Sequence, residues 1–233
     1  MLDRSQQLVD IMVTKRPEDI SALMSISPAL GTLNHDRFQD WQLPLNRKTA
    51  RPALVAFNGA VYAGMNARGT FTERDFTHAQ KSLRILSGLY GVLKPLDLML
   101  PYRLEMGTKL DNPAGKDLYA FWGDTITKAL QDAIVDSPGA NVLINLASQE
   151  YFGSVRPKKL EAPVINVSFL DGPQGDEKII GFFAKRARGA MAGWMIRERI
   201  TTVGKLPNFN AFGYSFDAAR STKTHLSFVR GPQ

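Results

Sequence analysis

The acidic side chains best placed for chemistry are Glu150 and Glu105. Glu150 follows Ser148 shortly after the apolar run Val142–Leu146, and ligands of α/β proteins favour the carboxyl ends of strands. Glu105 alternates with Arg103 among apolar neighbours, as on a strand with one polar face. Either carboxylate could serve as a general acid or base while Arg103 holds a phosphate. A surface ion pair and an ordinary helix start capped by Ser148 are the alternative interpretations.

Two glycines three residues apart, Gly88 and Gly91, lie in the segment Leu86–Asp97. They suit a tight hairpin whose backbone N–H groups approach a phosphate, which Lys94 would help to neutralise. Helix-hairpin-helix elements hold duplex DNA in this manner, although their glycines are usually two residues apart. The alternative is a structural turn with both glycines at positive φ.

Cations gather in two segments of the last third of the chain. The first segment is a loop after Ser148 that could form one wall of an anionic site. The second opens a helix expected over residues 184–200 and favours binding of a polyanion. The cations are Arg156, Lys158 and Lys159 in the loop, and Lys185, Arg186 and Arg188 in the helix.

The same helix carries a face without bulky side chains. Helical spacing places Gly189 and Gly193 on one face between Arg186 and Arg197, so a bulky partner could approach the backbone there. Close packing of a neighbouring helix is the alternative, with the arginines solvated at its edges. A separate stripe, expected to face the core, consists of Ala187, Met191 and Trp194.

The formal net charge of +7 is unevenly distributed. Cationic and anionic residues cancel up to Glu150, so the whole excess lies in the remaining third of the chain. Such asymmetry steers anions and is expected of nucleic-acid binding, although a merely basic soluble surface would look the same. A hydrophobic content of 44% with 22% charged residues is ordinary for a globular protein.

Several chemistries are excluded or unsupported. The absence of cysteine excludes disulfides, thiolate metal sites and a cysteine nucleophile. The three histidines are scattered without ligand spacing, and no dinucleotide or Walker pattern occurs, so we expect no metal site and no cofactor. No apolar run is long enough for a membrane span and the first residues show no signal-peptide pattern, so we expect a cytoplasmic protein without membrane partners.

The elements expected to position these residues alternate irregularly, without a linker or repeat, so we expect one domain over residues 1–233. Helices are expected within the first 45 residues, over 77–86 and over 184–200. Irregular alternation predicts a mixed α/β fold, a mixed sheet with covering helices. The expected strands are Leu54–Phe57 with Val61-Tyr62 as hairpin partner, Val142–Leu146, Val164–Phe169 antiparallel to Ile179–Phe183, and Leu226–Phe228.

A family resemblance rests on ungapped words that recur in order along essentially the whole chain. The words are Ser5–Leu8, Phe57–Tyr62, Leu86–Asp97, Pro101–Met106, Gly115–Tyr119, Phe121-Trp122, Asn145–Ser148, Glu150-Tyr151, Pro157–Lys159 and Ala187–Gly189. In these words the chain resembles the YaaA family, the peroxide stress proteins of bacteria. Members of that family usually carry a short strand and a Ser-Pro-Ala-Lys-Thr segment before the first word. This chain starts almost at that word, so we expect an exposed sheet edge if the strand belongs inside the sheet.

The resemblance implies an unusual α/β fold, cytoplasmic location, induction by hydrogen peroxide, and a lowering of free intracellular iron that limits oxidative DNA damage. It also implies DNA binding through a positively charged cleft and a helix-hairpin-helix-like element, which maps onto Leu86–Leu93. A base-modifying activity is a further implication, without any catalytic residue carried over.

Two hypotheses follow for function. The first is a DNA-binding stress-defence protein that holds the phosphate backbone without sequence preference. Its contacts would be Gly88, Gly91, Lys94, Arg103, Arg156, Lys158, Lys159, Lys185, Arg186 and Arg188. The second is a nucleobase- or nucleotide-modifying enzyme that uses Glu150 and Glu105 in the same cationic cleft.

Overall fold

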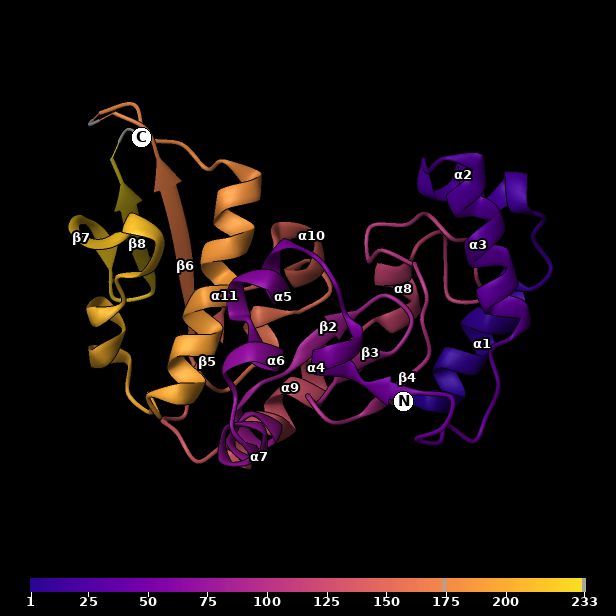
Figure 1. Cartoon of the computed structure of the whole chain (residues 1–233), viewed down its shortest axis with the longest axis horizontal. Helices are drawn as coiled ribbons and strands as arrows, with labels where there is room; N and C mark the ends of the chain where they lie inside the picture. The colour runs from indigo at the N-terminus through magenta and orange to yellow at the C-terminus, as the bar shows by residue number, and fades with distance from the viewer. Residues whose placement is uncertain (174, 232–233) are drawn as a thin grey trace. The chain divides into compact units, whose positions relative to one another are not determined.

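A computed structural model describes residues 1–173 and 175–231 and has a mixed α/β fold, as the sequence predicts (Figure 1). The chain divides into two compact units, each assembled from three separate segments. Unit 1 contains residues 1–56, 84–130 and 148–156, and unit 2 contains residues 57–83, 131–147 and 157 onward. The expectation of a single domain stays a prediction.

Unit 1 is largely helical, with two small two-stranded sheets. Its elements are α1 (Leu2–Met12), α2 (Pro17–Met24), α3 (Pro28–Gln39), β1 (Arg51–Pro52), α4 (Ala53–Ala56), β2 (Ile85–Ser87), β3 (Gly91–Leu93), β4 (Leu98–Met99), α8 (Leu118–Trp122) and α10 (Gln149–Phe152). A proline in the first turn begins both α2 and α3, and Ser27 caps α3 by accepting a hydrogen bond from the Leu30 N–H at 3.4 Å. The expected helices of the first 45 residues are thereby confirmed.

The core of unit 1 is held by aromatic side chains that are both buried and hydrogen-bonded. Trp122 is fully buried and its indole N–H donates to the Gly88 carbonyl at 2.9 Å. Trp41 donates in the same way to the Tyr90 hydroxyl at 3.0 Å. Because buried indole and phenol groups need partners, these bonds fix how the hairpin residues 88–90 pack.

Unit 2 contains the larger sheet, in the order β5-β6-β8-β7. Its elements are α5 (Ala60–Met65), α6 (Ala67–Thr70), α7 (Glu73–Ser82), β5 (Leu143–Asn145), η1 (Pro157–Lys159), β6 (Val164–Asp171), α11 (Gly181–Arg197), η2 (Val203–Asn208), η3 (Ala211–Gly213), β7 (Ser215–Thr222) and β8 (His225–Arg230), and α9 (Thr125–Val135) crosses from unit 1 into unit 2. Strand β6 runs parallel to β5 and to β8, whereas β7 is antiparallel to β8. Helix α11 lies along this sheet beside β6 (Figure 1).

The alternating burial of β6 gives the sheet its packed face. Ile165, Val167 and Phe169 are buried and contact Ala187 and Met191 of α11 in one hydrophobic cluster. Trp194 packs against the same cluster. The predicted core-facing stripe of this helix is therefore confirmed.

Three expected strands are wrong. The run Leu54–Phe57 forms α4 up to Ala56. Val61-Tyr62 lies in α5, because packing against α11 outweighs the β propensity of these two residues. Ile179–Phe183 does not pair with β6: Asp171 makes only an isolated bridge with Lys178, and α11 begins at Gly181.

Within the described residues, no helix combines the length and the apolar character that crossing a bilayer requires.

Candidate nucleic-acid interface

The glycine segment is a β-hairpin. Strands β2 and β3 are antiparallel with Ser87 opposite Gly91, and the Tyr90 N–H donates to the Ser87 hydroxyl across the turn at 2.8 Å. The expected helix-hairpin-helix-like element over Leu86–Leu93 is wrong, since both flanking elements are strands. The hydrogen bonds of the short ladder fix the segment in this form.

Both glycines of the hairpin are buried and have a packing reason for their identity. A Cβ at Gly88 would lie 2.1 Å from the Leu104 carbonyl oxygen. Gly91 has φ of +70°, and a Cβ there would lie 2.8 Å from the Trp122 ring. The alternative of a structural turn therefore accounts for both glycines, although only Gly91 has positive φ.

Lys94 follows the hairpin and is exposed. Its backbone N–H donates to the Asp97 carboxylate at 2.8 Å, which closes a turn around Pro95. No acidic side chain of the described residues forms an ion pair with the Lys94 ammonium group. The charge of Lys94 is thus available to solvent anions.

Arg103 and Glu105 form an ion pair between Nη2 and Oε1 at 2.7 Å. Their side chains are 41% and 47% exposed, so solvent weakens the attraction. The Nε atom of Arg103 is buried, however, and has no hydrogen-bond partner among the described residues. The Arg103 charge is shared with Glu105 rather than fully available to a phosphate.

Glu150 lies on α10, which Ser148 caps by accepting from the Tyr151 N–H at 3.3 Å. The predicted capped helix start is thus confirmed. Glu150 Oε1 accepts a hydrogen bond from the Gly107 N–H at 2.9 Å, and the Glu150 carbonyl accepts from the Tyr119 hydroxyl at 2.9 Å. These contacts fix the carboxylate beside the segment that carries Glu105.

Tyr151 is the residue that the sequence interpretation missed. Burial raises the pKa of its hydroxyl to about 12, and the charges of Glu150 and Glu105 act in the same direction, while Arg103 opposes them. The hydroxyl therefore stays protonated at neutral pH, beside two carboxylates and a guanidinium. We call Arg103, Glu105, Glu150 and Tyr151 the carboxylate–tyrosine cluster.

The expected cationic loop spans the boundary between the units. Arg156 belongs to unit 1, where its N–H donates to the Thr127 hydroxyl at 2.8 Å and its guanidinium donates to the Gly153 carbonyl at 3.0 Å. Lys158 and Lys159 belong to unit 2 and are exposed in η1. Lys158 has no ion-pair partner among the described residues.

The cations at the start of α11 differ in exposure. Lys185 and Arg186 are exposed, and neither forms an ion pair within the part of the chain that the structure describes. Arg188 is half-buried, and burial lowers the pKa of its guanidinium. Its Nε atom is buried without a hydrogen-bond partner among the described residues. Arg188 is thus less accessible to a polyanion than its two neighbours.

The face of α11 that lacks bulky side chains is covered by α5. A Cβ at Gly189 would lie 1.7 Å from the Val61 carbonyl oxygen, and one at Gly193 would lie 2.8 Å from the Met65 carbonyl oxygen. The partner that approaches this backbone is therefore a helix of the same unit, and a polyanion cannot occupy the face. Close helix packing, the alternative interpretation, is correct.

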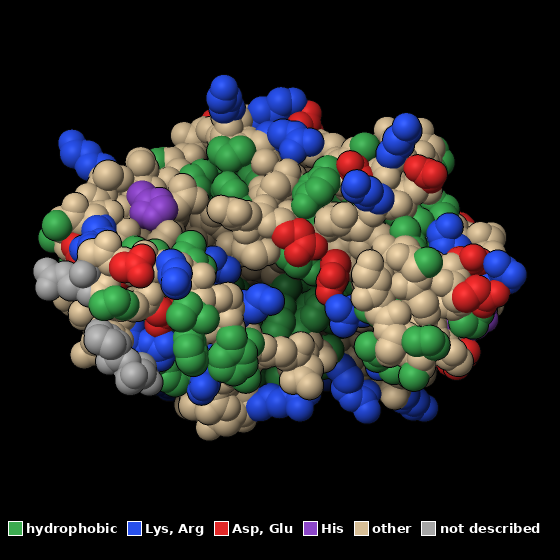
Figure 2. Space-filling view, turned by 90° about the horizontal axis from the view of Figure 1, so that it is seen from above, with side chains coloured by type: hydrophobic (Ala, Val, Ile, Leu, Met, Phe, Trp, Pro, Cys, Tyr) green, Lys and Arg blue, Asp and Glu red, His purple; other side chains and the backbone are tan. Residues whose placement is uncertain are grey.

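The structure gathers some predicted site residues and disperses others. Unit 1 brings Arg103, Glu105 and Glu150 together around Tyr151. On the face shown in Figure 2, Lys and Arg side chains are spread among hydrophobic and acidic ones. Among the described residues, no group of three His, Asp or Glu side chains is arranged to hold a metal ion.

Fold and charge together define a mixed α/β protein with exposed, unneutralised cations. The model of a family described as peroxide stress protein YaaA matches residues 1–220. The chain belongs to this family, and membership supports a role in the response to peroxide stress.

Proposed function

We propose that the protein binds DNA through the phosphate backbone during peroxide stress and so limits oxidative damage to it. The observation that carries this proposal is a set of exposed cations without acidic partners among the described residues. Among the contacts expected from the sequence, this set, here called the free cations, consists of Lys94, Lys158, Lys185 and Arg186. Each can neutralise a phosphate and release a counterion, which is the main source of sequence-independent affinity.

The free cations differ from three arginines whose guanidinium groups already form ion pairs with carboxylates. Arg199, Arg220 and Arg230 each lie within 2.7 Å of a carboxylate oxygen. A phosphate would have to compete with these carboxylates. The proposed contacts are therefore the free cations first, with Arg103, Arg156, Lys159 and Arg188 contributing less. The amides of Gly88 and Gly91 are not needed for the proposal.

The test is the salt dependence of binding to duplex DNA of several sequences. We expect log K to fall linearly with log salt, with a slope of about −0.9 per phosphate neutralised. Replacing Lys158 and Lys185 together by glutamine should flatten that slope by nearly two and weaken all sequences alike. The matched control replaces Lys205 and Lys223, which are exposed in unit 2 and carry the same total charge.

Two outcomes would reject DNA binding as proposed. One is affinity that does not change with salt. The other is an equal loss in the control variant, which would show that only net charge matters.

We further propose that the protein lowers free iron in cells, as the family implies. Membership of the peroxide stress protein family supports this role. Loosely bound iron after a peroxide pulse should be higher in cells that lack the protein than in cells that carry it. Iron titration of the purified protein separates direct binding from an indirect effect.

The carboxylate–tyrosine cluster favours a second candidate, an enzyme acting on a nucleobase or nucleotide. A protonated tyrosine beside two carboxylates can donate a hydrogen bond while a carboxylate exchanges a proton. Glu150→Gln keeps an acceptor for the Gly107 N–H, so it should preserve the local fold. If this variant and Tyr151→Phe bind DNA normally but fail to protect cells from peroxide, an enzyme is supported. If protection is unchanged, the cluster has no catalytic part.

A further inference from the structure

A pocket of about 340 Å³ opens in unit 2 where α11 begins. Helix α11 starts at the same end of unit 2 at which β6 and β8 finish (Figure 1). The pocket is lined by Phe183 and Arg186 of α11, Phe212 of η3, Tyr214, and Arg230 at the end of β8. Three aromatic rings and two guanidinium groups thus meet in one small space.

One guanidinium of the pocket serves as a fixed wall. Arg230 is buried and pairs with Asp171, with its Nη2 2.6 Å from Oδ1. Its guanidinium lies over the Phe183 ring at 4.1 Å and over the Tyr214 ring at 5.1 Å. The charges of Arg230 and Asp171 cancel, so this pair gives the pocket shape rather than net charge.

The other guanidinium supplies the charge of the pocket. Arg186 lies over the Phe212 ring at 4.7 Å and is exposed, without a carboxylate partner among the described residues. Phe212 is 43% exposed and has φ of +56°, a conformation that a bulky residue rarely adopts. Backbone outliers of this kind gather at binding sites, where the surrounding structure holds them.

We propose that this pocket binds one nucleotide of a single-stranded nucleic acid, with its base on the aromatic rings and its phosphodiester at Arg186. The inference rests on the proposed DNA binding and names a more specific contact for it. Every base has a π face that stacks on an aromatic side chain, and an adjacent cation holds the backbone. The single unneutralised charge matches one phosphodiester, and the volume lies at the small end of ligand pockets, which begin at roughly 300 Å³.

The experiment compares single-stranded and duplex DNA. The probe is an octathymidylate with one central 2-aminopurine, whose fluorescence reports stacking, and its duplex is the reference ligand. Phe212→Leu removes the stacking ring without changing charge, and we expect it to weaken single-strand binding about tenfold while duplex binding is unchanged. Phe212→Tyr keeps the ring and should bind as the original does. The matched control is Phe182→Leu, because Phe182 is exposed nearby but does not line the pocket.

Each outcome decides between the pocket and the wider proposal. Equal single-strand affinity in Phe212→Leu and Phe182→Leu overturns the pocket, while salt-dependent duplex binding would still stand. Single-strand binding that depends on Phe212 without duplex binding supports the pocket and rejects duplex recognition. Binding of neither ligand rejects both. If Phe212→Leu has a lower melting temperature than the original protein, Phe212→Tyr becomes the deciding variant. Failure of Phe212→Tyr to bind the single-stranded probe then overturns the proposed pocket site.

Discussion

Asp171 and Arg230 stand opposite each other on adjacent parallel strands, at the last position of β6 and the last position of β8. The Asp171 Oδ1 atom accepts from the Arg230 Nε at 2.6 Å, and its Oδ2 accepts from the Tyr214 hydroxyl at 2.6 Å. Both carboxylate oxygens therefore have donors, although the pair is buried. Breaking such a pair leaves a buried charge uncompensated.

Asp171→Asn should destabilise the protein by about 3–5 kcal/mol, since Arg230 would keep its charge without a counter-charge. The measurement is the free energy of unfolding from urea denaturation at neutral pH. The control is Asp19→Asn, because Asp19 pairs with Arg16 in solvent and its loss should matter far less. Equal effects of the two substitutions would contradict the prediction.

Gly189→Ala should separate α11 from α5, because the new methyl group would meet the Val61 carbonyl at 1.7 Å. Overpacking a protein core lowers stability by about 1–3 kcal/mol. Because the new methyl group would meet a backbone carbonyl, we expect the cost for Gly189→Ala at or above the upper end of this range. Gly181→Ala on the same helix meets nothing within 4 Å and should not destabilise. Thermal unfolding of both variants tests the difference, and an unchanged midpoint for Gly189→Ala would refute it.

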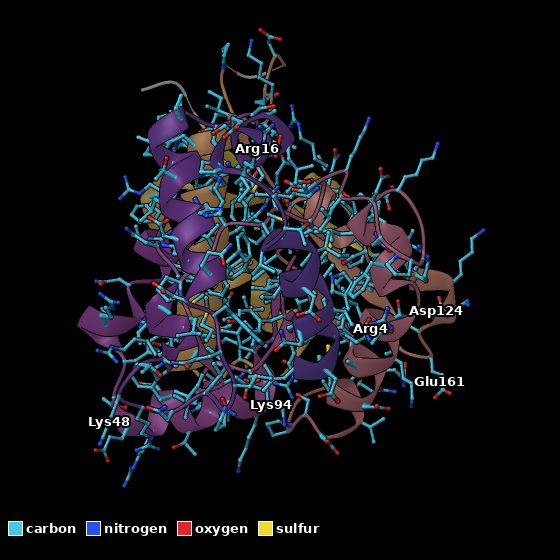
Figure 3. All side chains as sticks on the ribbon, turned by 90° about the vertical axis from the view of Figure 1, so that its right-hand side faces the viewer. Arg4, Arg16, Lys48, Lys94, Asp124 and Glu161 are labelled. Atoms are coloured by element: carbon cyan, nitrogen blue, oxygen red, sulfur yellow. The ribbon has the colours of Figure 1, made fainter. Side chains whose placement is uncertain are left out.

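Arg4→Lys should weaken unit 1. In Figure 3 Arg4 projects from α1 toward α8 and α9, where its guanidinium donates to the Thr125 hydroxyl at 2.8 Å and to the Phe121 carbonyl. The guanidinium also lies over the Phe121 ring at 4.6 Å. A lysine ammonium group lacks the planar fork of a guanidinium and cannot make both hydrogen bonds in this geometry. We therefore expect the free energy of unfolding, measured by urea denaturation, to fall by roughly 1–3 kcal/mol. Arg16→Lys, on the surface, should show no comparable loss.

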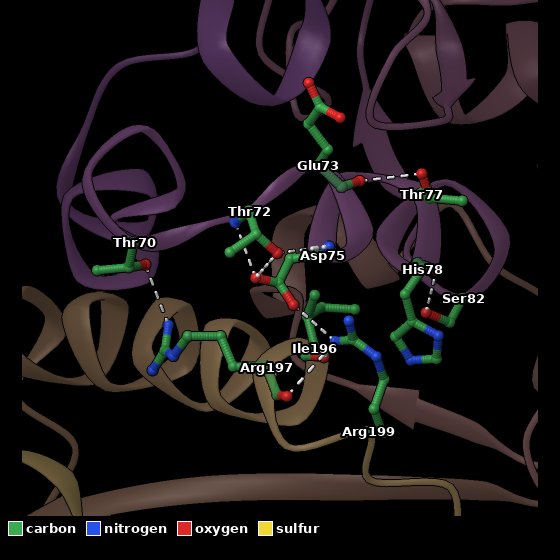
Figure 4. Close-up of polar contacts among 10 residues, drawn as sticks. All are labelled: Thr70, Thr72, Glu73, Asp75, Thr77, His78, Ser82, Ile196, Arg197 and Arg199. Carbon is green, nitrogen blue, oxygen red and sulfur yellow. Dashed lines mark hydrogen bonds and ion pairs between the residues drawn. The ribbon is translucent and has the colours of Figure 1, made fainter.

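Asp75 should make the stability of unit 2 sensitive to acid. The Thr72 backbone N–H lowers the pKa of Asp75 from 3.8 to about 2, assisted by the Arg199 guanidinium and the Thr72 hydroxyl (Figure 4). A folded-state pKa below the unfolded value gives stability that is present above pH 3.8 and lost as the pH falls toward 2.

Asp75→Asn removes this titration. The free energy of unfolding of the variant should lie below that of the original protein at pH 6, and the gap should narrow steadily between pH 4 and pH 2. Parallel curves over that interval would show that Asp75 does not contribute to the acid response.

The sequence predicted those elements whose signals are local. Pro17, Ser27 and Ser148 mark helix starts because capping depends on residues within one turn. Strand β6 combines β-branched and aromatic residues and is followed by turn residues, and its alternation of buried positions is present in the structure. The core stripe of α11 likewise follows from helical spacing alone.

Elements decided by distant contacts were not predictable in the same way. Val61 has high β propensity, yet it is helical because Gly189 of α11 lets α5 approach closely. Strand β7 was missed because its residues are largely exposed and lack an apolar run. The environment of Tyr151 depends on residues 103–107, more than forty positions away, so spacing could not reveal it.

Strand β8 lies between β6 and β7 in the sheet but follows both in the chain. During synthesis, β6 therefore waits with an open hydrogen-bonding edge while some fifty further residues, including all of α11, emerge from the ribosome. A nascent chain with such an edge is a natural client for chaperones. Translation that stalls before His225 should accordingly release an aggregation-prone product rather than a slightly shortened protein.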